Sequence, residues 1–576
     1  MKVLLVNPPL ASFELVYSAV PILLGQLQGA KIDSKAIDLN IEYLHDILNP
    51  KYLSEVLKKL DEIYASNLKK ISENLAPDNI ENLKQQNKLI EQYYLSDKEK
   101  VKKAVSFSYK YLYLYKEKKY DAEDKEFLYI KKMFATFFKL VCLPYYPTFF
   151  QISFSSSGKW FILNEKRFNF NHSFSCVYDF LSNRKENIYI DYYEKKIKEI
   201  KADKYDVIGI TIPFESNLIP ALTLAKMLKQ KTKAKIVIGG IFVNSTIESY
   251  LKHREFFGEV FDAILTGEGE LSIVDYVRHI QDKLPIEKVS GLIYKKEGSI
   301  VRNIASYVSN VDELKAPSYK GIHWKNYIKK TANIEFSKGC YWGRCAYCYA
   351  NTQKRYHIKS VDKAVNIIQA LHKKEKIKEF SIMDDSLNVN FANKFAEELI
   401  KRKLKIEYSC FFRFEENLTY PVMKTLKESG LTAVFFGLES ASERILSLMN
   451  KGIKLDVARR IIKDMHRAGI AVDLGVMYGF PTETEEDIKI TLDFLEEVKP
   501  YVRHFNNFKF TMLKSSGLLS KKENFSITNV REIEEFSEYL LYEAPCVSDE
   551  RINELIHERG YFYLPLYTKW NMSKKI

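Results

Sequence analysis

The sequence predicts an α/β protein in which a doubly wound parallel sheet is followed by a partial (β/α)6 barrel. Short apolar runs alternate with helical periodicity in two separate parts of the chain, as buried parallel strands and their crossover helices do. In the first part, glycine pairs and charged turns directly follow the apolar runs, at the edge where such sheets bind ligands. A chain of 576 residues has room for two such units and for further segments.

The composition is that of a folded protein, with 46% hydrophobic and 28% charged residues. The formal net charge of +14 permits an anionic partner but does not select one. Seven cysteines are too few for a disulfide framework in so long a chain, which indicates a reducing, cytoplasmic location. Because Asn7, Pro8 and Pro9 interrupt the apolar N-terminus and no later run is long enough to span a bilayer, neither a signal peptide nor a membrane partner is expected.

Five apolar runs predict the first sheet. The run at 3–7 ends at Pro8, and a run at 35–39 follows one helical stretch, which makes a βαβ unit. After a long interval come three more runs, at 207–212, 235–239 and 263–266. The residues that end or follow these three runs are candidates for ligand contact, because they stand at the carboxyl ends of strands. They are Pro213, Phe214, Glu215, Ser216, Asn217, Gly239, Gly240, Gly267, Glu268 and Gly269.

The interval between the second and third runs, 41–200, is too long for a loop and is expected to be a mostly helical insertion. Within it, 109–120 interleaves lysines with tyrosines. A nucleic-acid surface and a solvated helix with a Tyr/Leu core face explain this pattern equally well, and we favour the helix. The expected domains are 1–40 with 201–315, the insertion 41–200, the barrel 316–514 and a C-terminal helical extension 515–576.

Six further apolar runs predict the partial barrel, and they lie at 334–337, 379–384, 407–412, 433–438, 471–477 and 508–513. Barrel chemistry occurs at the carboxyl ends of the strands. The reactive, charged or turn-forming residues at those ends are Cys340, Asp384, Asp385, Arg413, Glu439, Ser440 and Tyr478. The extension has helical patterns at 531–542 and 549–558 and no chemical motif.

The strongest motif is KGCYWGRCAYC, in which Cys340, Cys345 and Cys348 follow the first barrel strand with C-x4-C-x2-C spacing. Three thiolates on one loop can hold zinc or an iron–sulfur cluster. A structural zinc needs a fourth ligand, for which His357 is the nearest candidate. A four-iron cluster on three cysteines instead leaves one iron open to a substrate or cofactor. The other cysteines lack metal-ligand spacing, and Cys410 is expected to be a buried small hydrophobe; the rest are Cys142, Cys176 and Cys546.

This loop, placed after the first strand of a six-unit βα domain, resembles the radical S-adenosylmethionine (SAM) enzymes. Their usual spacing is C-x3-C-x2-C, so this loop has one extra residue, but the aromatic residue before the last cysteine is kept as Tyr347. The resemblance implies that the three cysteines bind a [4Fe–4S] cluster, that Tyr347 lies near the adenine of SAM, and that Asp384 with Asp385 meets its amino group.

Other barrel motifs extend the resemblance. FFGLES, which contains Glu439 and Ser440, the pair Lys451-Gly452 and YGFPTET, which begins at Tyr478, are similar to stretches near the ribose and adenine of SAM in that family. Arg413, at the carboxyl end of a predicted barrel strand, is a further candidate for binding the cofactor.

The first sheet resembles the Rossmann-like cobalamin-binding domain of one branch of the superfamily. LLVNPP, VIGITI, IVIGG and LTGEGE occur in the same order, and APSY at 316–319 resembles the linker that follows. The D-x-H-x-x-G signature is absent, which implies cobalamin without a histidine lower ligand. The long insertion and FESNL at 214–218 look like enzymes that modify ribosomally made peptides, including carbon methyltransferases.

The resemblance implies methylation of an unactivated carbon of a peptide or other natural product, through a 5′-deoxyadenosyl radical and methylcobalamin, with an electron donor of the flavodoxin or ferredoxin type. Two alternatives keep the radical chemistry: ring closure, oxidation or rearrangement without methyl transfer, and a corrin domain that no longer binds cobalamin. An alternative of another class is a basic nucleic-acid-binding protein with structural zinc, based on the +14 charge and the Lys/Tyr-rich insertion, although nucleic acid is not the expected partner.

Overall fold

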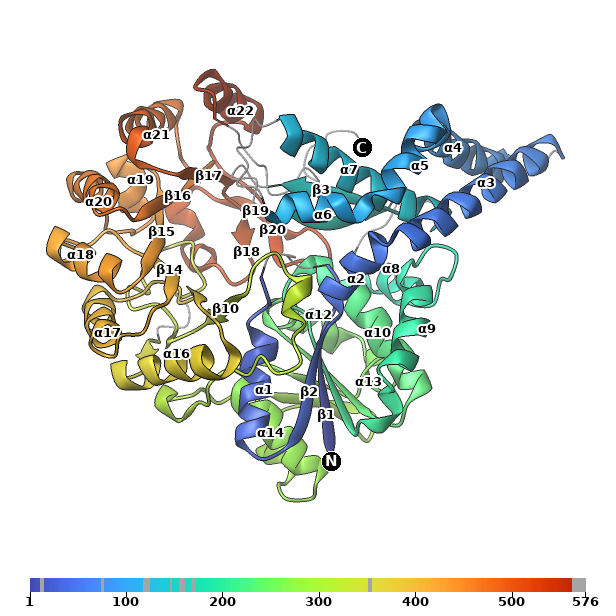
Figure 1. Cartoon of the computed structure of the whole chain (residues 1–576), viewed down its shortest axis with the longest axis horizontal. Coiled ribbons are helices and arrows are strands. Elements are labelled where there is room, and N and C mark those ends of the chain that lie inside the picture. The colour runs from blue at the N-terminus through green and yellow to red at the C-terminus, as the bar shows by residue number, and fades with distance from the viewer. Residues whose placement is uncertain are drawn as a thin grey trace.

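A computed structural model describes residues 1–10, 15–73, 77–117, 125–145, 148–154, 161–167, 172–350 and 355–561. Two large sheets organise it. The first has the strand order β2-β1-β5-β6-β7-β8-β9 and the second the order β10-β13-β14-β15-β16-β17. The second sheet and its helices curve along one side of the molecule, next to the first sheet (Figure 1).

Five parallel strands form the body of the first sheet, as the apolar runs predict. They are β2 (Asp33–Asp38), β1 (Lys2–Asn7), β5 (Val207–Thr211), β6 (Lys235–Gly239) and β7 (Ala263–Leu265). Every residue of β5 is buried, because helices cover both faces of the sheet. The sequence analysis missed the antiparallel strands β8 (Leu292–Lys296) and β9 (Ser299–Arg302), which extend the edge beyond β7.

Helices α1 (Ala19–Gly29) and α14 (Gly269–Ile280) pack on one face of this sheet, where their leucines, isoleucine and valines share a core with Val3, Leu5 and Val207. The opposite face carries α9 (Tyr189–Glu199) and α10 (Leu218–Lys231). Short helices follow β6, namely α11 (Ile241–Ser245), α12 (Ile247–Lys252) and α13 (Phe256–Glu259). The sheet is therefore doubly wound, as expected.

All six strands of the second sheet run parallel. They are β10 (Thr331–Ile334), β13 (Glu379–Ile382), β14 (Glu407–Phe412), β15 (Leu431–Glu439), β16 (Ala471–Tyr478) and β17 (His504–Lys509). Their helices lie on the outer side (Figure 1). These are α16 (Val361–Glu375), α17 (Val389–Lys401), α18 (Tyr420–Glu428), α19 (Glu443–Leu448), α20 (Leu455–Arg467) and α21 (Glu485–Val498).

The two edge strands of this sheet differ from the expected positions. The first was expected at 334–337 but ends at Ile334, because Ser337 and Lys338 pair with a different strand. The last was expected at 508–513 but lies at His504–Lys509, where an edge strand tolerates polar residues. The more apolar residues that misled the prediction, Phe510 and Met512, instead fill a small core under the C-terminal extension.

Strand β14 shows how the second sheet separates its two faces. Tyr408, Cys410 and Phe412 are buried under the outer helices, whereas the alternate residues are half-buried on the inner face. The interpretation of Cys410 as a buried small hydrophobe is confirmed. From this strand the inner face receives Ser409 and Phe411, and Phe411 packs on Phe435 of the next strand.

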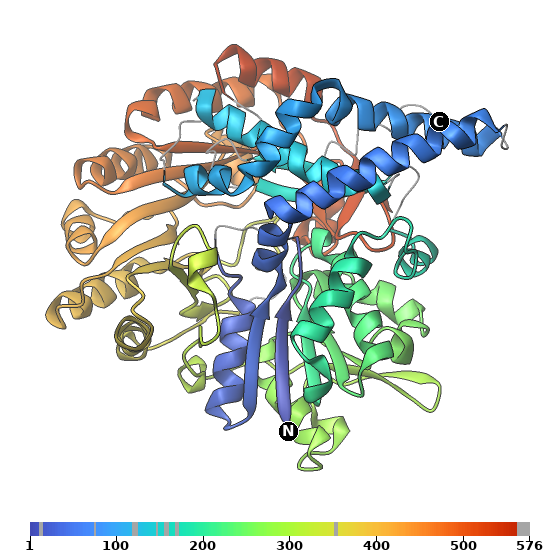
Figure 2. The same cartoon turned by 45° about the vertical axis from the view of Figure 1, so that its right-hand side comes forward.

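The insertion is mostly helical and lies over the carboxyl end of the first sheet (Figures 1 and 2). Its helices are α2 (Leu39–Ile47), α3 (Pro50–Ser72), α4 (Pro77–Tyr93), α5 (Lys98–Ser106), α6 (Ser108–Glu117), α7 (Lys125–Cys142) and α8 (Phe174–Phe180). Strand β3 (Thr148–Phe154) pairs antiparallel with β4 (Phe161–Arg167). In α6, Tyr111 and Leu112 are buried while Tyr109 and Tyr113 are exposed, in agreement with a solvated helix that has a core face; residues 118–120 lie outside the described residues.

The C-terminal extension begins with a small antiparallel sheet of β18 (Met512–Leu513), β20 (Tyr539–Glu543) and β19 (Thr528–Glu532), with the 3-10 segment η9 (Gly517–Phe525) between β18 and β19. The helix expected at 531–542 is wrong. Its apolar residues have helical spacing, but Leu540 pairs with Met512, and Phe536 docks against Tyr250 of α12, with ring centroids 5.0 Å apart.

The helix expected at 549–558 is confirmed as α22 (Asp549–Glu558), and Arg551 ties it to Glu485 of α21 at 3.0 Å. Among the described helices, none combines the length and the apolar character that a membrane crossing requires.

Candidate functional site

Two short paired strands, here called the neck, connect the cysteine loop to the second sheet. Strand β11 (Ser337–Lys338) pairs antiparallel with β12 (His357–Ile358), so residues 339–356 form a loop closed at its base, of which 351–354 are not described. Asp384, just beyond β13, accepts hydrogen bonds through Oδ1 from the backbone N–H groups of Phe336 (2.9 Å) and Ser337 (2.7 Å). The Asp384 carboxylate therefore holds the neck.

Cys340, Cys345 and Cys348 all lie on this loop, half-buried and without disulfide partners. Burial raises the pKa of the Cys348 thiol to about 12. Burial also raises the pKa of the Cys345 thiol, while Lys451 and Arg413 oppose the rise. Because metals bind thiolates, a metal centre on this loop would displace the thiol protons.

A chain of polar contacts lies beside the cysteines on the inner face of the second sheet. Lys451 Nζ donates to Glu439 Oε1 (2.9 Å) and to the Tyr347 hydroxyl (3.1 Å). The Arg413 guanidinium lies 4.1 Å from the Trp342 ring centroid, and its Nε is buried without a hydrogen-bond partner among the described residues. The structure thus brings Tyr347, Arg413 and Glu439 together with the cysteines.

The two adjacent aspartates have different partners. Asp384 faces the neck, whereas Asp385 accepts a hydrogen bond from the Tyr349 hydroxyl (2.9 Å), which the cysteine loop supplies. Burial raises the pKa of both carboxyl groups, that of Asp384 to about 6. Of the two, Asp385 is the one next to the cysteines on the loop side.

Ser440 and Tyr478 are not brought to the cysteines. Ser440 is buried, its hydroxyl lies 3.1 Å from the Thr491 hydroxyl, and it accepts a hydrogen bond from the Ser442 N–H, so it supports the start of α19. Tyr478 is fully buried in the core at the end of β16. The turn that follows holds a buried carboxyl group, Glu483, which accepts from the Gly479 N–H at 2.6 Å.

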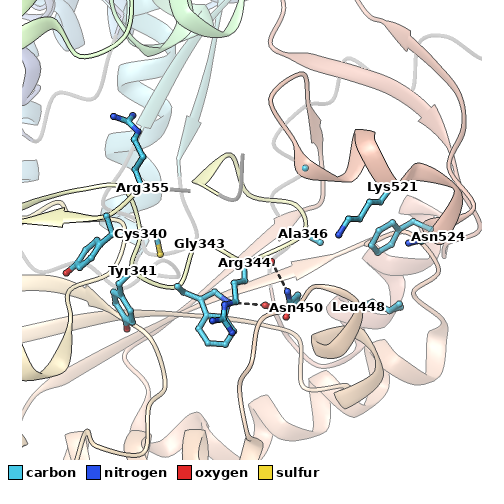
Figure 3. A pocket seen from close by; sticks show the side chains of 14 residues that line it. Cys340, Tyr341, Gly343, Arg344, Ala346, Arg355, Leu448, Asn450, Lys521 and Asn524 are labelled. Carbon is cyan, nitrogen blue, oxygen red and sulfur yellow. Dashed lines mark hydrogen bonds between the residues drawn. The ribbon is translucent and has the colours of Figure 1, made fainter. Parts of the chain in front are cut away.

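A cavity of about 600 Å³ lies between the cysteine loop and the extension. Figure 3 shows Cys340 and Tyr341 on one wall and Lys521 and Asn524, from η9, across from them. Arg344 lines the cavity between the two walls and holds Asn450 through its carbonyl oxygen at 3.1 Å. The C-terminal extension therefore completes a space that the barrel alone leaves open.

At the carboxyl edge of the first sheet, the FESNL loop binds the chain that follows β1. Asn217 donates to the carbonyl oxygens of Pro8 (3.2 Å) and Pro9 (2.9 Å), and Ser216 donates to that of Leu10 (2.8 Å). Pro213 is buried beside them. Phe214, by contrast, is 47% exposed, as is Ile241 after β6 at 49%. Large apolar side chains thus line this edge without being buried.

Glu215 turns toward the insertion and the extension. His172 Nδ1 lies 3.0 Å from Glu215 Oε1 and 2.8 Å from Glu534 Oε2, and the three side chains are mostly buried. The backbone N–H of His172 also donates to the Glu534 carboxylate, and the backbone carbonyl oxygen of His172 accepts from the N–H of Phe536. This contact joins three parts of the chain at the edge of the first sheet.

The glycines at this edge serve the packing of the chain itself. A Cβ at Gly240, where φ is +121°, would meet the Ile212 carbonyl oxygen at 2.6 Å, and one at Gly239 would meet that of Leu265 at 2.9 Å. The Gly267 N–H donates to Asn244 at 3.1 Å. Gly269 begins α14, where a Cβ would lie 3.2 Å from Leu23. Glu268 faces Arg355 at 3.2 Å rather than open solvent.

Several residues that the structure places at the site were not selected from the sequence: Trp342, Tyr349 and Arg355 of the loop and Lys338 of the neck. Glu270 and Lys451 stand in motifs that were selected, but their pairing with Lys338 and with Glu439 was not predicted. Tyr349 and Trp342 stand inside the cysteine motif, where their position alone was a usable signal. The charged residues have no local signal, because their partners come from distant parts of the chain.

The radical SAM superfamily matches residues 334–495, which include the cysteine loop and most of the second sheet. An uncharacterized methyltransferase of Pyrococcus horikoshii is 32% identical over 313 residues, which is 52% of this chain and 66% of the relative. The anaerobic magnesium-protoporphyrin IX monomethyl ester cyclase of Rubrivivax gelatinosus is 26% identical over 54% of this chain and 58% of its own length. The chain thus spans less than two thirds of these relatives.

Among solved structures, the radical S-adenosylmethionine methyltransferase TsrM from Kitasatospora setae, with cobalamin and a [4Fe-4S] cluster bound, has a TM-score of 0.56. The match covers 97% of this chain and 90% of TsrM at 12% sequence identity. At that identity the likeness shows the fold, in which the expected succession of a doubly wound sheet and a partial barrel is confirmed.

We predict that Cys340→Ala, Cys345→Ala and Cys348→Ala each prevent reconstitution of iron and sulfide and abolish SAM cleavage, because two thiolates do not hold a stable cluster. Metal and sulfide analysis of anaerobically reconstituted protein measures this. Cys546→Ala is the matched control, since Cys546 lies outside the loop, and it should retain wild-type iron. Wild-type iron and activity in any loop variant would contradict the assignment.

We also predict that stability falls as the pH rises from about 5 to about 8 because of Glu483. Burial raises the pKa of this carboxyl group to about 8 in the folded protein, above its ordinary 4.5. Between these values only the folded state keeps the proton, so the free energy of unfolding decreases with pH, by at most about 1.4 kcal/mol per unit. Urea unfolding of Glu483→Gln should show a flatter pH dependence, and the exposed Glu486→Gln should not. An equal slope in wild type and Glu483→Gln would refute the effect.

Proposed function

The chain belongs to the radical SAM superfamily, and on that premise we propose that it is a cobalamin-dependent radical SAM enzyme that methylates an unactivated carbon of a peptide or other natural product. One observation carries the proposal. A loop with three unpaired cysteines leaves the first strand of a parallel six-stranded sheet, beside the carboxyl edge of a doubly wound sheet.

The residues of the loop fit a cluster and SAM. The three half-buried thiols would hold a [4Fe–4S] cluster through three of its irons. The buried Arg413 Nε, without a partner among the described residues, suits an anionic or polar group of a bound cofactor. Asp385, held by the Tyr349 hydroxyl, is a suitable partner for the ammonium group of SAM.

The edge of the first sheet fits a large flat ligand. Phe214 and Ile241 follow neighbouring strands and are each about half exposed, which offers an apolar surface to a corrin ring. Ser216 and Asn217 keep that surface in place by donating to carbonyl oxygens of the chain after β1, and Pro213 is buried beside them. These contacts support cobalamin as the ligand of this edge.

When bound, SAM and the cluster supply a radical that removes a substrate hydrogen, and cobalamin supplies the methyl group. The protein residues then have three tasks. The Lys451–Glu439 pair and Tyr347 present charge and an aromatic ring to SAM on the inner face of the sheet. Trp342 lies against the Arg413 guanidinium, with 4.1 Å between the guanidinium and the ring centroid, and would keep it in place beside the cysteines. The cavity between the loop and the extension would receive the substrate.

We assign substrate recognition to the insertion, residues 41–200, and to the extension, residues 515–576. The extension lines the cavity through Lys521 and Asn524. The insertion lies over the carboxyl end of the first sheet. The domains 1–40 with 201–315 and 316–514 would carry cobalamin and the cluster with SAM, respectively. A flavodoxin or ferredoxin of the cytoplasm would supply the electron, in a compartment that keeps the cysteines reduced.

A second candidate keeps both cofactors and closes a ring without net methyl transfer. The similarity to the cyclase of Rubrivivax gelatinosus favours it. The inner face of the second sheet serves either reaction, because both begin with removal of a substrate hydrogen.

We predict that the protein, reconstituted anaerobically with iron, sulfide and hydroxocobalamin, holds about four irons and about one corrin per chain. With SAM, reductant and the true substrate, methyl transfer should yield both 5′-deoxyadenosine and S-adenosylhomocysteine, measured by liquid chromatography and mass spectrometry. Deuterated methyl from SAM should appear in the product. If 5′-deoxyadenosine alone forms, methyl transfer is wrong and the cyclase candidate stands; zinc without sulfide or corrin would contradict both.

We predict that the bound cobalamin has no histidine lower ligand. The electron paramagnetic resonance spectrum of the cob(II)alamin form should then show no splitting from a protein nitrogen, and any splitting from the benzimidazole base of cobalamin itself should be the same in wild type and in histidine variants. The decisive variant is His172→Gln, because His172 reaches the edge of the first sheet through Glu215. An unchanged spectrum in His172→Gln agrees with the prediction, whereas nitrogen splitting that disappears in this variant would overturn it.

A further inference from the structure

Two glutamates at the start of α14, which follows strand β7 of the first sheet, face the base of the cysteine loop. In the turn LTGEGE after β7, Glu270 Oε1 lies 2.5 Å from Lys338 Nζ of β11. Glu268 Oε1 lies 3.2 Å from Nη1 of Arg355, the residue where the described chain returns toward β12. One turn of the first sheet thus makes an ion pair with each side of the base of the cysteine loop.

Both ion pairs are shielded from water. The side chains of Glu270 and Lys338 are 5% and 18% exposed, and those of Glu268 and Arg355 are 12% and 21% exposed. Lys338 also lies 2.9 Å from Glu335 of its own strand connection. Burial alone would raise the pKa of the Glu270 carboxyl group, but Lys338 holds it below its ordinary value. Removing one partner would leave a buried charge uncompensated, which is costly.

The partners are themselves held in place. Glu268 Oε2 accepts a hydrogen bond from the Val308 N–H at 2.7 Å, and the Arg355 guanidinium lies 3.5 Å from the ring centroid of Tyr307. The two sides of the neck are in close backbone contact, because a Cβ at Gly339 would stand 2.1 Å from the Arg355 carbonyl oxygen. Movement of either strand of the neck would therefore move the other and break both ion pairs.

We propose that Glu268 and Glu270 are positioning residues that fix the cysteine loop, in place and in orientation, against the carboxyl edge of the first sheet. One ion pair restrains one side of the base of the loop, whereas two pairs on opposite sides restrain its orientation as well. Glu268, which the sequence analysis assigns to cobalamin, acts instead through Arg355.

The consequence for cofactors rests on the proposed function. If the loop holds the cluster and the sheet edge holds cobalamin, the two ion pairs set the separation of the two metal centres. That separation decides whether a substrate radical forms within reach of the methyl group. We call these two ion pairs the clamp. The clamp is part of the fold, and its effect would be seen as coupling between the cluster site and the cobalamin site.

The first test measures the magnetic interaction between the two centres in the reconstituted holoenzyme. With the cluster reduced and cobalamin in its cob(II)alamin form, the cluster should speed the spin relaxation of cob(II)alamin, seen as microwave power saturation. Lys338→Met and Glu270→Gln should lose this enhancement, and Lys338→Arg should retain it. The double variant should be no worse than either single variant, because the two residues act through one contact.

The second test needs no cofactor. Hydrogen exchange of the neck, residues 335–340 and 355–359, should be faster in Lys338→Met than in wild type, followed by mass spectrometry on the full chain. Arg302→Met is the matched control, since Arg302 makes an exposed ion pair with Glu248 at 3.2 Å in the same unit. It should behave as wild type in both tests.

The outcomes separate the two proposals. Wild-type relaxation and wild-type exchange in Lys338→Met would overturn the clamp. A wild-type protein that binds neither cluster nor cobalamin would overturn the proposed function, and the exchange experiment would then decide the clamp alone. If Lys338→Met showed faster hydrogen exchange but wild-type spin relaxation, the proposal that the ion pairs set the distance between the two cofactors would be wrong.

Discussion

Two backbone N–H groups at the base of the cysteine loop donate to one buried carboxylate, and the geometry of the site depends on that contact. The chain leaves β10 and turns sharply, so the N–H groups of Phe336 and Ser337 have no strand partner in the large sheet. Asp384 of the neighbouring strand supplies one. Although burial raises its pKa to about 6, the group is ionised at neutral pH and can accept both bonds. The short neck, and hence the placement of the thiols, follows from it.

The segments around the loop have different roles in building the site. The sheets supply strand ends, whereas the extension supplies a wall of the cavity and the insertion covers the carboxyl end of the first sheet. One continuous core joins Phe134 and Phe137 of the insertion to Ile208 of the first sheet and Ile334 of the second. Because such cores are close-packed, the walls cannot shift independently of the strand ends. A site for radical chemistry benefits from this, since water and stray hydrogen donors must be kept out.

The sequence predicts those parts of the fold that depend on local pattern. Continuous apolar runs located the inner parallel strands, and cysteine spacing located the loop, because both signals lie within a few residues. The strand at His504–Lys509 was not predicted, since an edge strand carries polar residues, and such a composition is also typical of a loop. The segment at 531–542 has helical periodicity but pairs as strands, because docking of Phe536 on Tyr250 outweighs local preference. Contacts such as Glu270 with Lys338 join distant segments, and no local pattern encodes them.

The loop is held by directional polar contacts rather than by a core of its own. Two of its aromatic residues lie against charged groups: Trp342 against Arg413, and Tyr349 against the Asp385 carboxylate. Apolar contacts tolerate sliding, whereas hydrogen bonds and buried ion pairs lose most of their strength when the partners shift. A loop that must present three thiols at a fixed place is therefore better served by contacts of this kind, even though each one requires desolvation of a charged or polar group.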